Sequence, residues 1–147
     1  EPEGKASLAV GLDATAAYSY TDTKVTKTSE ADQLGKNLTY TPENQASLWL
    51  DYTHQTGEFA GFGLGSGIRY VGANYGDLSN SQKAPSYVLF DAAVHYDFKK
   101  LDPRLQGMRL AVNMTNLLDK EYLVSCGEGS CFYGQRRTVL ASLRYNW

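Results

Sequence analysis

Apolar and polar residues alternate along the last part of the chain. From Val139 to Trp147 every second residue is apolar or aromatic, and the residues between them are mostly polar. A period of two predicts a β-strand with one apolar face and one wet face. A soluble domain seldom stops in mid-strand on an exposed tryptophan. In a closed barrel within lipid, the last strand pairs with a neighbour and its aromatic residue lies at the membrane interface.

The same alternation recurs upstream and predicts six long antiparallel strands, separated by segments rich in turn-forming residues. Residues 1–9 are expected to end one segment and turn into the next. With roughly 11 to 17 residues each, the strands exceed the usual soluble length of about 5 to 6 and suit strands tilted across a bilayer. The expected strands are residues 11–27, 45–55, 62–76, 87–99, 108–124 and 137–147.

The connections between these strands alternate in length. Residues 28–44, 77–86 and 125–134 are long and polar, whereas residues 56–61 and 100–107 are shorter. Outer-membrane barrels carry long loops outside and short turns on the periplasmic side, so every connection agrees with one orientation. Six strands are too few to close such a barrel, since the smallest type has about eight. We therefore expect an all-β fold that is part of a larger barrel.

One expected strand, residues 62–76, carries glycine at alternate positions. Gly63, Gly65 and Gly67 share one face with Arg69, whereas the large apolar residues lie on the other. Small residues on one face of a strand predict either close packing against that face or a bend in the barrel wall.

Composition narrows the class of protein without deciding it. The net charge is −2, and Lys and Arg are spread along the chain, so no basic patch favours nucleic acid. Mean hydropathy is −0.41 and no apolar run is long enough for a transmembrane helix. The 11 Tyr outnumber the 5 Phe and 2 Trp. A ring with a polar tip suits a membrane–water boundary, but it also suits ligand sites and half-buried strands.

The two cysteines, Cys126 and Cys131, lie close together in a Gly- and Ser-rich segment. A zinc site would need further ligands, and the two histidines, His54 and His95, are remote in the sequence. We therefore expect no metal site here and a disulfide across a loop tip, which indicates an oxidising compartment. No signal peptide opens the chain, so for an exported protein we expect the true N-terminus to lie elsewhere.

Residues 112–122 resemble the near-terminal motif of TonB-dependent outer-membrane receptors. That motif runs Val-Asn-Asn-Leu-Phe-Asp and then Lys or Arg, Glu and Tyr; here Leu118 stands in place of Phe. Further segments resemble the ferrichrome and ferrioxamine, or hydroxamate-siderophore, branch of this family, and together they cover essentially the whole chain. They are residues 46–52, 69–72, 75–77, 124–126, 131–134 and 137–147.

The resemblance implies a transmembrane β-barrel of about 22 strands with an N-terminal plug domain in its lumen. Residues 1–147 would form the C-terminal segment of that barrel, as its last six strands. The family imports ferric siderophores across the bacterial outer membrane, driven by TonB with ExbB and ExbD. The resemblance therefore implies a receptor rather than an enzyme, with no covalently bound cofactor and a ferric hydroxamate as transported ligand. Expected partners are the plug and remaining strands, the TonB–ExbB–ExbD complex, the barrel-assembly machinery, and outer-membrane lipid and lipopolysaccharide.

Three aromatic residues are the candidate ligand contacts. Phe132 and Tyr133 match aromatic positions of the family's last outer loop, where rings would contact a bulky, mostly neutral iron complex. The family member best matched has an aromatic residue just after the first cysteine, where this chain has Gly127, so that contact is absent here. Trp49 lies on a wet face and is expected to contact either the ligand or, in preference, the plug.

Two further groups of residues have expected places in such a barrel. Aromatic residues on the apolar faces are expected at the membrane interfaces: Tyr18, Tyr20, Tyr52, Tyr70, Tyr96, Tyr145 and Trp147. Charged residues on the wet faces are expected to pair with the plug or with neighbouring strands: Asp13, Asp51, Arg69, Asp91, Asp97, Arg109 and Arg144.

Three other interpretations remain open at this point. The chain could form a stand-alone porin- or adhesin-like barrel from several copies, or a soluble all-β binding domain that buries its apolar faces inside. An outer-membrane hydrolase would need a nucleophile and a base. His95 and Asp97 share a face, but no nucleophile with a matching context accompanies them, so we expect no catalytic residues.

Overall fold

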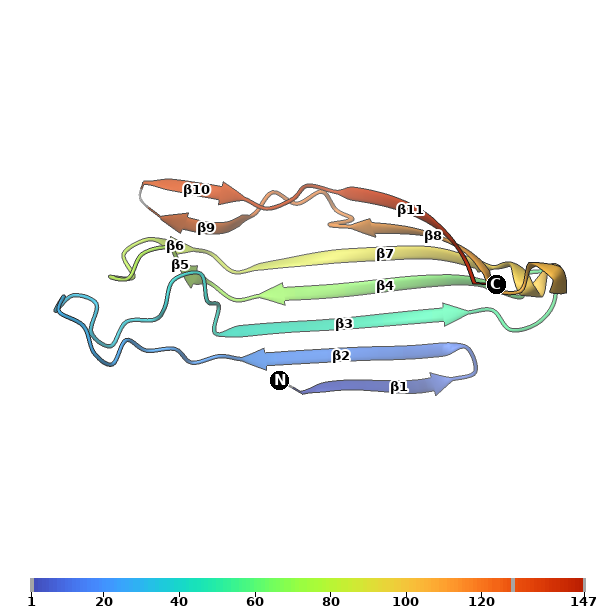
Figure 1. The fold of residues 1–147 in the computed structure, drawn as a ribbon, viewed down its shortest axis with the longest axis horizontal. Coiled ribbons are helices and arrows are strands. Elements are labelled where there is room, and N and C mark those ends of the chain that lie inside the picture. Colours follow the sequence, from blue (N-terminus) through green and yellow to red (C-terminus); the bar gives the residue numbers. More distant parts are fainter. Residues whose placement is uncertain (1, 128, 147) are drawn as a thin grey trace.

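One antiparallel sheet of seven strands forms the body of the molecule. The computed structural model describes residues 2–127 and 129–146. The strands lie side by side along the long axis (Figure 1) in the order β1 (Glu3–Ala9), β2 (Leu12–Tyr20), β3 (Asn44–Thr53), β4 (Phe62–Val71), β7 (Tyr87–Asp97), β8 (Met108–Thr115) and β11 (Thr138–Tyr145). Strands that are neighbours in this order pair antiparallel throughout.

Four short elements complete the fold. Two are hairpins, β5 (Asn74–Tyr75) with β6 (Lys83–Ala84) and β9 (Leu123–Gly127) with β10 (Ser130–Tyr133). The other two are 3-10 turns, η1 (Phe98–Lys100) and η2 (Pro103–Leu105). No helix among the described residues is long and apolar enough to cross a membrane. The all-β prediction is confirmed.

The predicted number and length of the strands are wrong. The main sheet has seven strands rather than six, and they run from 7 to 11 residues rather than roughly 11 to 17. The missed strand is β1, which was expected to be part of a turning segment. All seven of its residues are exposed and it includes Gly4, so its own pattern is weak. Pairing with β2 makes it a strand.

Several predicted strands end earlier than expected because the chain turns at particular residues. The segment expected at 108–124 stops at Thr115, since Asn116 adopts a left-handed φ of 51° and starts a turn. The segment at 62–76 stops at Val71, beyond which the Gly72 N–H donates to the Asn44 carbonyl at 2.8 Å. The segment at 11–27 stops at Tyr20. Alternation alone does not reveal such turns.

The apolar face of the sheet is left uncovered. Leu48, Leu64 and Leu143 are 42%, 50% and 60% exposed, and Val139 is 58% exposed. These residues are not packed into a compact centre, as a soluble binding domain would require. A continuous apolar face of this size on a single sheet indicates contact with lipid or with another apolar surface. Trp147, at the end of the same predicted face, lies outside the described residues.

Tyrosines mark the two ends of this apolar face. Tyr18 and Tyr70 flank Ala46 in one row across the sheet, and Tyr20 lies on the same face one step further along β2. At the opposite ends of the strands, Tyr96 pairs with Phe62 and Tyr145 pairs with Met108; Tyr52 also lies towards that end. Apolar residues fill the band between. Two aromatic rows around an apolar band are typical of a membrane-spanning barrel wall.

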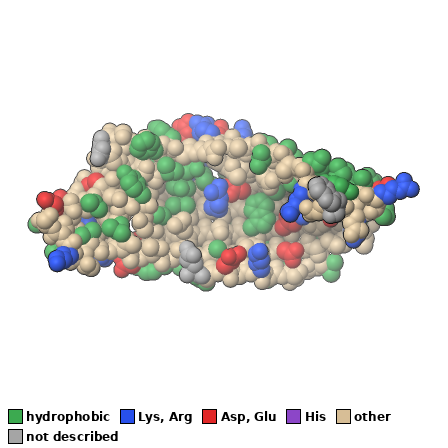
Figure 2. Space-filling view, in the orientation of Figure 1, with side chains coloured by type: hydrophobic (Ala, Val, Ile, Leu, Met, Phe, Trp, Pro, Cys, Tyr) green, Lys and Arg blue, Asp and Glu red, His purple; other side chains and the backbone are tan. Residues whose placement is uncertain are grey.

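On the inner face, which carries the polar residues, side chains of the neighbouring strands pack over the glycines of β4. A Cβ placed on Gly65 or Gly67 would lie 2.4 Å from the Trp49 ring, and one on Gly63 would lie 2.0 Å from the His95 ring. The expectation of close packing on this face is therefore confirmed. Figure 2 shows charged side chains of both signs over the middle of the sheet.

The connections separate into two kinds at opposite ends of the sheet (Figure 1). At one end, called here the turn end, lie Val10–Gly11 between β1 and β2, residues 54–61, and the segment with η1 and η2. At the other, the loop end, lie residues 21–43 and the two hairpins. The predicted alternation of long and short connections is confirmed, although two of the long loops contain hairpins.

Replacing Gly67 with valine should destabilise the folded protein by about 1–3 kcal/mol, because the branched side chain would displace the Trp49 ring. The control is Ser66→Val, which places the same valine side chain on the opposite, exposed face of the same strand. The temperature at which the protein unfolds in detergent measures the effect. Equal temperatures for both variants would show that the glycine face is not tightly packed.

Candidate functional site

Three segments that are distant in the sequence contact one another at the loop end. The segment 21–43 is joined to the β5–β6 hairpin by a reciprocal pair of hydrogen bonds. The Asn37 N–H donates to Asn80 Oδ1 at 2.7 Å, and Asn80 Nδ2 donates to the Asn37 carbonyl at 2.9 Å. The Tyr40 N–H donates to the Tyr75 carbonyl at 2.7 Å. The long segment is thereby held on the hairpin.

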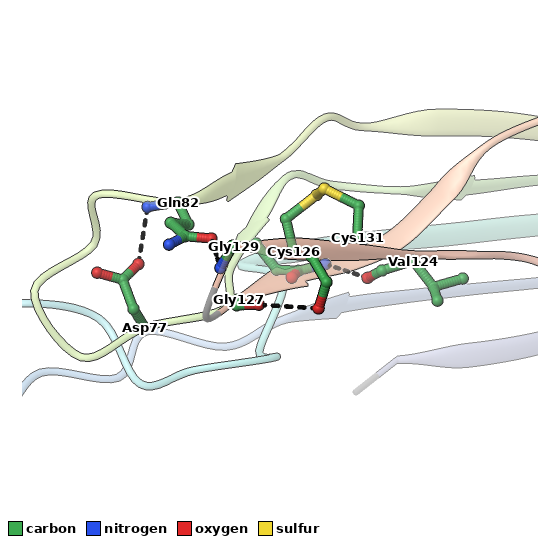
Figure 3. Close-up of a disulfide and its surroundings, with 9 residues drawn as sticks. Asp77, Gln82, Val124, Cys126, Gly127, Gly129 and Cys131 are labelled. Carbon is green, nitrogen blue, oxygen red and sulfur yellow. Dashed lines mark hydrogen bonds between the residues drawn. A yellow bond between two sulfur atoms is a disulfide. The ribbon is translucent and has the colours of Figure 1, made fainter.

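The β9–β10 hairpin contains the predicted disulfide. Cys126 and Cys131 are directly opposite each other in the register, with an S–S distance of 2.06 Å and a Cα–Cα distance of 4.0 Å (Figure 3). Cys126 is only 5% exposed, whereas Cys131 is exposed. The bridge ties the two strands of the hairpin together, with its β9 side buried and its β10 side in solvent.

Phe132 and Tyr133 lie on the exposed strand of this hairpin. Their exposed fractions are 61% and 71%, so neither ring is used to pack the hairpin within this chain. Both rings are available to contact another molecule at the loop end. Their role as ligand contacts stays a prediction.

Trp49 lies apart from the two hairpin aromatics. It is in the middle of β3, on the inner face, where it pairs with Thr15 and Gly67. The hairpin lies beyond the ends of the long strands (Figure 1). The structure therefore does not bring the three candidate ligand residues together, and Trp49 could contact only something that reaches into the sheet's inner face.

Tyr40 is a residue at the loop end that the sequence did not single out. It has a left-handed φ of 57°, which is uncommon for a bulky residue, and it is 58% exposed. A Cβ placed on Gly127 would lie 3.2 Å from its hydroxyl oxygen. The backbone bond to Tyr75 and the contact with Gly127 place a third exposed aromatic residue beside the disulfide hairpin. No local pattern around residue 40 predicts this position.

Charged residues on the inner face pair between strands of the sheet. Arg69 on β4 binds Asp91 on β7 in a bidentate pair, at 2.5 Å and 3.0 Å. His95 Nε2 lies 3.1 Å from both carboxylate oxygens of Asp51 on β3. His95 thus pairs with Asp51 and not with Asp97, its neighbour in the sequence. The expectation that charged residues pair with a neighbouring strand is confirmed for Arg69 and Asp91; His95 and Asp51 pair across β4, which lies between their strands.

The motif at 112–122 is a turn built around a buried asparagine. Asn116 is 2% exposed; its Nδ2 donates to the carbonyls of Lys120 and Gln135, and its Oδ1 accepts the Lys120 N–H. Its own N–H donates to Asp91 at 2.9 Å. Asp119 in the same turn binds the Arg136 guanidinium. The motif therefore fixes the exit of β8 against β7 and against the segment leading to β11.

A hollow of about 430 Å³ lies near the loop end of β1 to β4, lined in part by polar residues of the inner face such as Ser47, Gln45 and Arg69. None of the three candidate ligand residues lines it. The described residues contain no group of three or more His, Cys, Asp and Glu side chains that could hold a metal ion.

Comparisons with known proteins place these features in one family. The family model described as "TonB dependent receptor-like, beta-barrel" matches residues 3–117. The chain is 37% identical to the ferrichrome outer membrane transporter/phage receptor of Escherichia coli K12, over 100% of this chain and 19% of that protein. It is 41% identical to the ferrioxamine B receptor of Salmonella typhimurium, over 88% of this chain and 18% of that protein. The chain thus spans about a fifth of these relatives.

Solved structures share the fold. The ferric preacinetobactin receptor BauA of Acinetobacter baumannii has a TM-score of 0.79 at 22% identity, over 97% of this chain and 21% of that chain. The ferric yersiniabactin uptake receptor FyuA of Yersinia pestis has a TM-score of 0.78 at 18% identity, over 99% of this chain and 22% of that chain. Identities this low establish the fold alone.

A pH dependence is expected for the β5–β6 hairpin because of Asp77. The Ser79 hydroxyl and then the Gln82 N–H hold the pKa of the Asp77 carboxyl well below its ordinary value. Since the folded pKa is lowered, the stabilisation is present above the ordinary aspartate pKa and is lost as the pH falls through the lowered value. Asp77→Asn should therefore speed amide hydrogen exchange of residues 74–84 at neutral pH, relative to wild type.

That difference should narrow as the pH falls below about 4, where the Asp77 carboxyl begins to be protonated in the opened hairpin while it is still ionised in the folded one. Asp32→Asn, at an exposed aspartate of the neighbouring loop, controls for the change in net charge. A difference that stays constant down to the lowest pH tested would contradict the assigned role of the Asp77 carboxylate.

Proposed function

Because the chain belongs to the TonB-dependent receptor family, in its β-barrel domain, we propose that it forms part of an outer-membrane receptor that imports a ferric siderophore of the hydroxamate type. The family places the chain in the bacterial outer membrane, and its relatives are transport receptors rather than enzymes. The observation that carries the proposal is the uncovered apolar face, between two rows of tyrosines, on a sheet whose other face is polar.

We propose that residues 1–147 are the C-terminal segment of a barrel of about 22 strands. Among the described residues, β1 and β11 each pair with a single neighbour, so each has an open edge. In hydrocarbon, each backbone group left without a partner costs several kcal/mol. Strands from the rest of the receptor would cover both edges and close the wall.

The loop end is the proposed ligand-binding side. It carries the long connections, which face outward in outer-membrane barrels. Phe132 and Tyr133 would place apolar ring faces and one hydroxyl against the organic shell of a ferric hydroxamate. The names of the two curated relatives, a ferrichrome transporter and a ferrioxamine B receptor, support this ligand class. The iron would travel as part of the ligand and would not be a resident metal of this chain.

The inner face is the proposed contact for the plug. TonB-dependent receptors pair with a plug domain and with TonB. The face that would enclose the plug carries Trp49 and the polar hollow near Arg69. Trp49 would therefore contact the plug, or a ligand that passes between the plug and the barrel wall. We propose ExbB and ExbD, the barrel-assembly machinery and lipopolysaccharide as the further partners. The receptor would need no covalently bound cofactor.

In the complete receptor, Phe132→Ala and Tyr133→Ala should each weaken binding of ferrioxamine B by about five- to tenfold, because each removes an exposed ring from the ligand. Phe59→Ala is the matched control, since Phe59 is a 68% exposed aromatic residue at the turn end. Fluorescence titration of the purified receptor measures the affinity. Affinities equal to wild type for both hairpin variants would remove these two residues from the site.

A further inference from the structure

Backbone touches backbone where the β5–β6 hairpin meets the disulfide hairpin. A Cβ placed on Gly76 would lie 1.5 Å from the Cys126 carbonyl oxygen, and one on Gly127 would lie 2.7 Å from the Gly76 carbonyl oxygen. Both glycines are buried. The φ of Gly76 is outside the left-handed region. Glycine is therefore required at residue 76 for space and not for its backbone conformation.

Asn74 adds a hydrogen bond next to this contact. It is 4% exposed, and its Nδ2 donates to the Val124 carbonyl at 2.9 Å. Val124 lies on the same strand as Cys126, two residues earlier. At the tip of the disulfide hairpin, the Gly129 N–H donates to Gln82 Oε1 at 3.3 Å. Figure 3 shows the bond between Gly129 and Gln82 at the tip of the hairpin. The β5–β6 hairpin thus supports β9 along its length.

The opposite strand of the disulfide hairpin presents the aromatic residues. Phe132 and Tyr133 lie on β10, and all four residues of that strand are exposed. The disulfide and the register bonds join β10 to β9, so a shift of β9 carries the aromatic strand with it. One strand is anchored and the other is open to solvent. The anchored strand can therefore hold the exposed strand, with its two aromatic residues, in one position.

We propose that Asn74 and Gly76 are positioning residues for ligand binding: they hold the disulfide hairpin in one orientation, so that Phe132 and Tyr133 are in place before the ligand arrives. This inference rests on the proposed function, because it assumes that the two aromatics contact a ferric hydroxamate. Neither Asn74 nor Gly76 contacts the ligand in this arrangement. Their effect on affinity comes from ordering the hairpin in advance, which lowers the entropic cost of binding.

The test uses the complete receptor and two measurements on each variant. Gly76→Ala forces the hairpin away from Gly76, so amides of residues 123–133 should exchange with solvent faster than in wild type. Its affinity for ferrioxamine B should fall by about tenfold, and bound ligand should restore part of the lost protection. Gly4→Ala is the matched control, because no atom lies within 4 Å of a Cβ placed there and its φ is also ordinary.

A triple variant separates positioning from a general structural role. If Gly76 acts through the aromatic strand, Gly76→Ala should have little further effect on affinity in a receptor that already carries Phe132→Ala and Tyr133→Ala. An undiminished tenfold loss in that background would overturn the proposal. Should Gly76→Ala fail to assemble, Asn74→Ala provides the same readings, with Asn113→Ala at an exposed inner-face asparagine as its control.

The remaining outcomes are also decisive. Exchange and affinity that match the Gly4→Ala control would overturn the inference. Faster exchange with unchanged affinity would show that the hairpin's position does not matter for binding, which also overturns it. If the wild-type receptor binds no ferric hydroxamate, the proposed function and the ligand part of this inference fail. The exchange data then still decide whether Asn74 and Gly76 hold the hairpin.

Discussion

Backbone hydrogen bonding between neighbouring strands is the constraint on which the whole structure depends. In lipid, a peptide N–H or C=O cannot turn to water, so every strand of the wall must pair on both sides. The five interior strands of the main sheet do so within this chain, in antiparallel pairs. The open edges of β1 and β11 are where the proposed remaining strands would join. Side-chain alternation then decides only which face meets lipid and which meets the lumen.

The inner face shows how a single sheet remains ordered without a covering layer of its own. Glycines on β4 leave room for the Trp49 and His95 rings to lie close to the backbone. Asp91 binds Arg69 of β4 and the Asn116 N–H of the turn after β8, so one carboxylate joins three parts of the chain. A buried carboxylate is tolerated there because its oxygens are hydrogen-bonded and paired. The apolar face needs no such contacts, since lipid would cover it.

The sequence predicted what depends on local pattern. Alternation at Leu48, Leu50 and Tyr52 correctly indicated the apolar face of β3, and the pair Cys126 and Cys131 correctly indicated a disulfide. It overestimated strand lengths, because alternation continues past residues where the backbone turns, as at Asn116. It missed β1, whose side chains are all exposed and which is a strand because β2 pairs with it.

The candidate site was predictable only in part, because only some of it depends on local pattern. The sequence of residues 131–133 shows that two aromatic residues directly follow a cysteine. The contacts that place them, from Asn74, Gly76 and Tyr40, come from segments some tens of residues away along the chain and follow no period. Long-range backbone contacts of this kind depend on where loops meet in space, which a one-dimensional pattern does not contain. The family resemblance supplied the function class, and the structure supplied the arrangement.

The central claim is that alternate side chains of these strands face hydrocarbon while their neighbours face a polar lumen. Spin labels placed singly at Leu48, Leu64 and Leu143, and at Ser47 and Ser142, in the reconstituted complete receptor would test it directly. Collision rates with oxygen and with a water-soluble nickel chelate report the surroundings of each label. The account predicts high oxygen and low nickel collision at the three leucine positions, and no such lipid signature at the two serines. A lipid signature at the serines, or water access at the leucines, would contradict it.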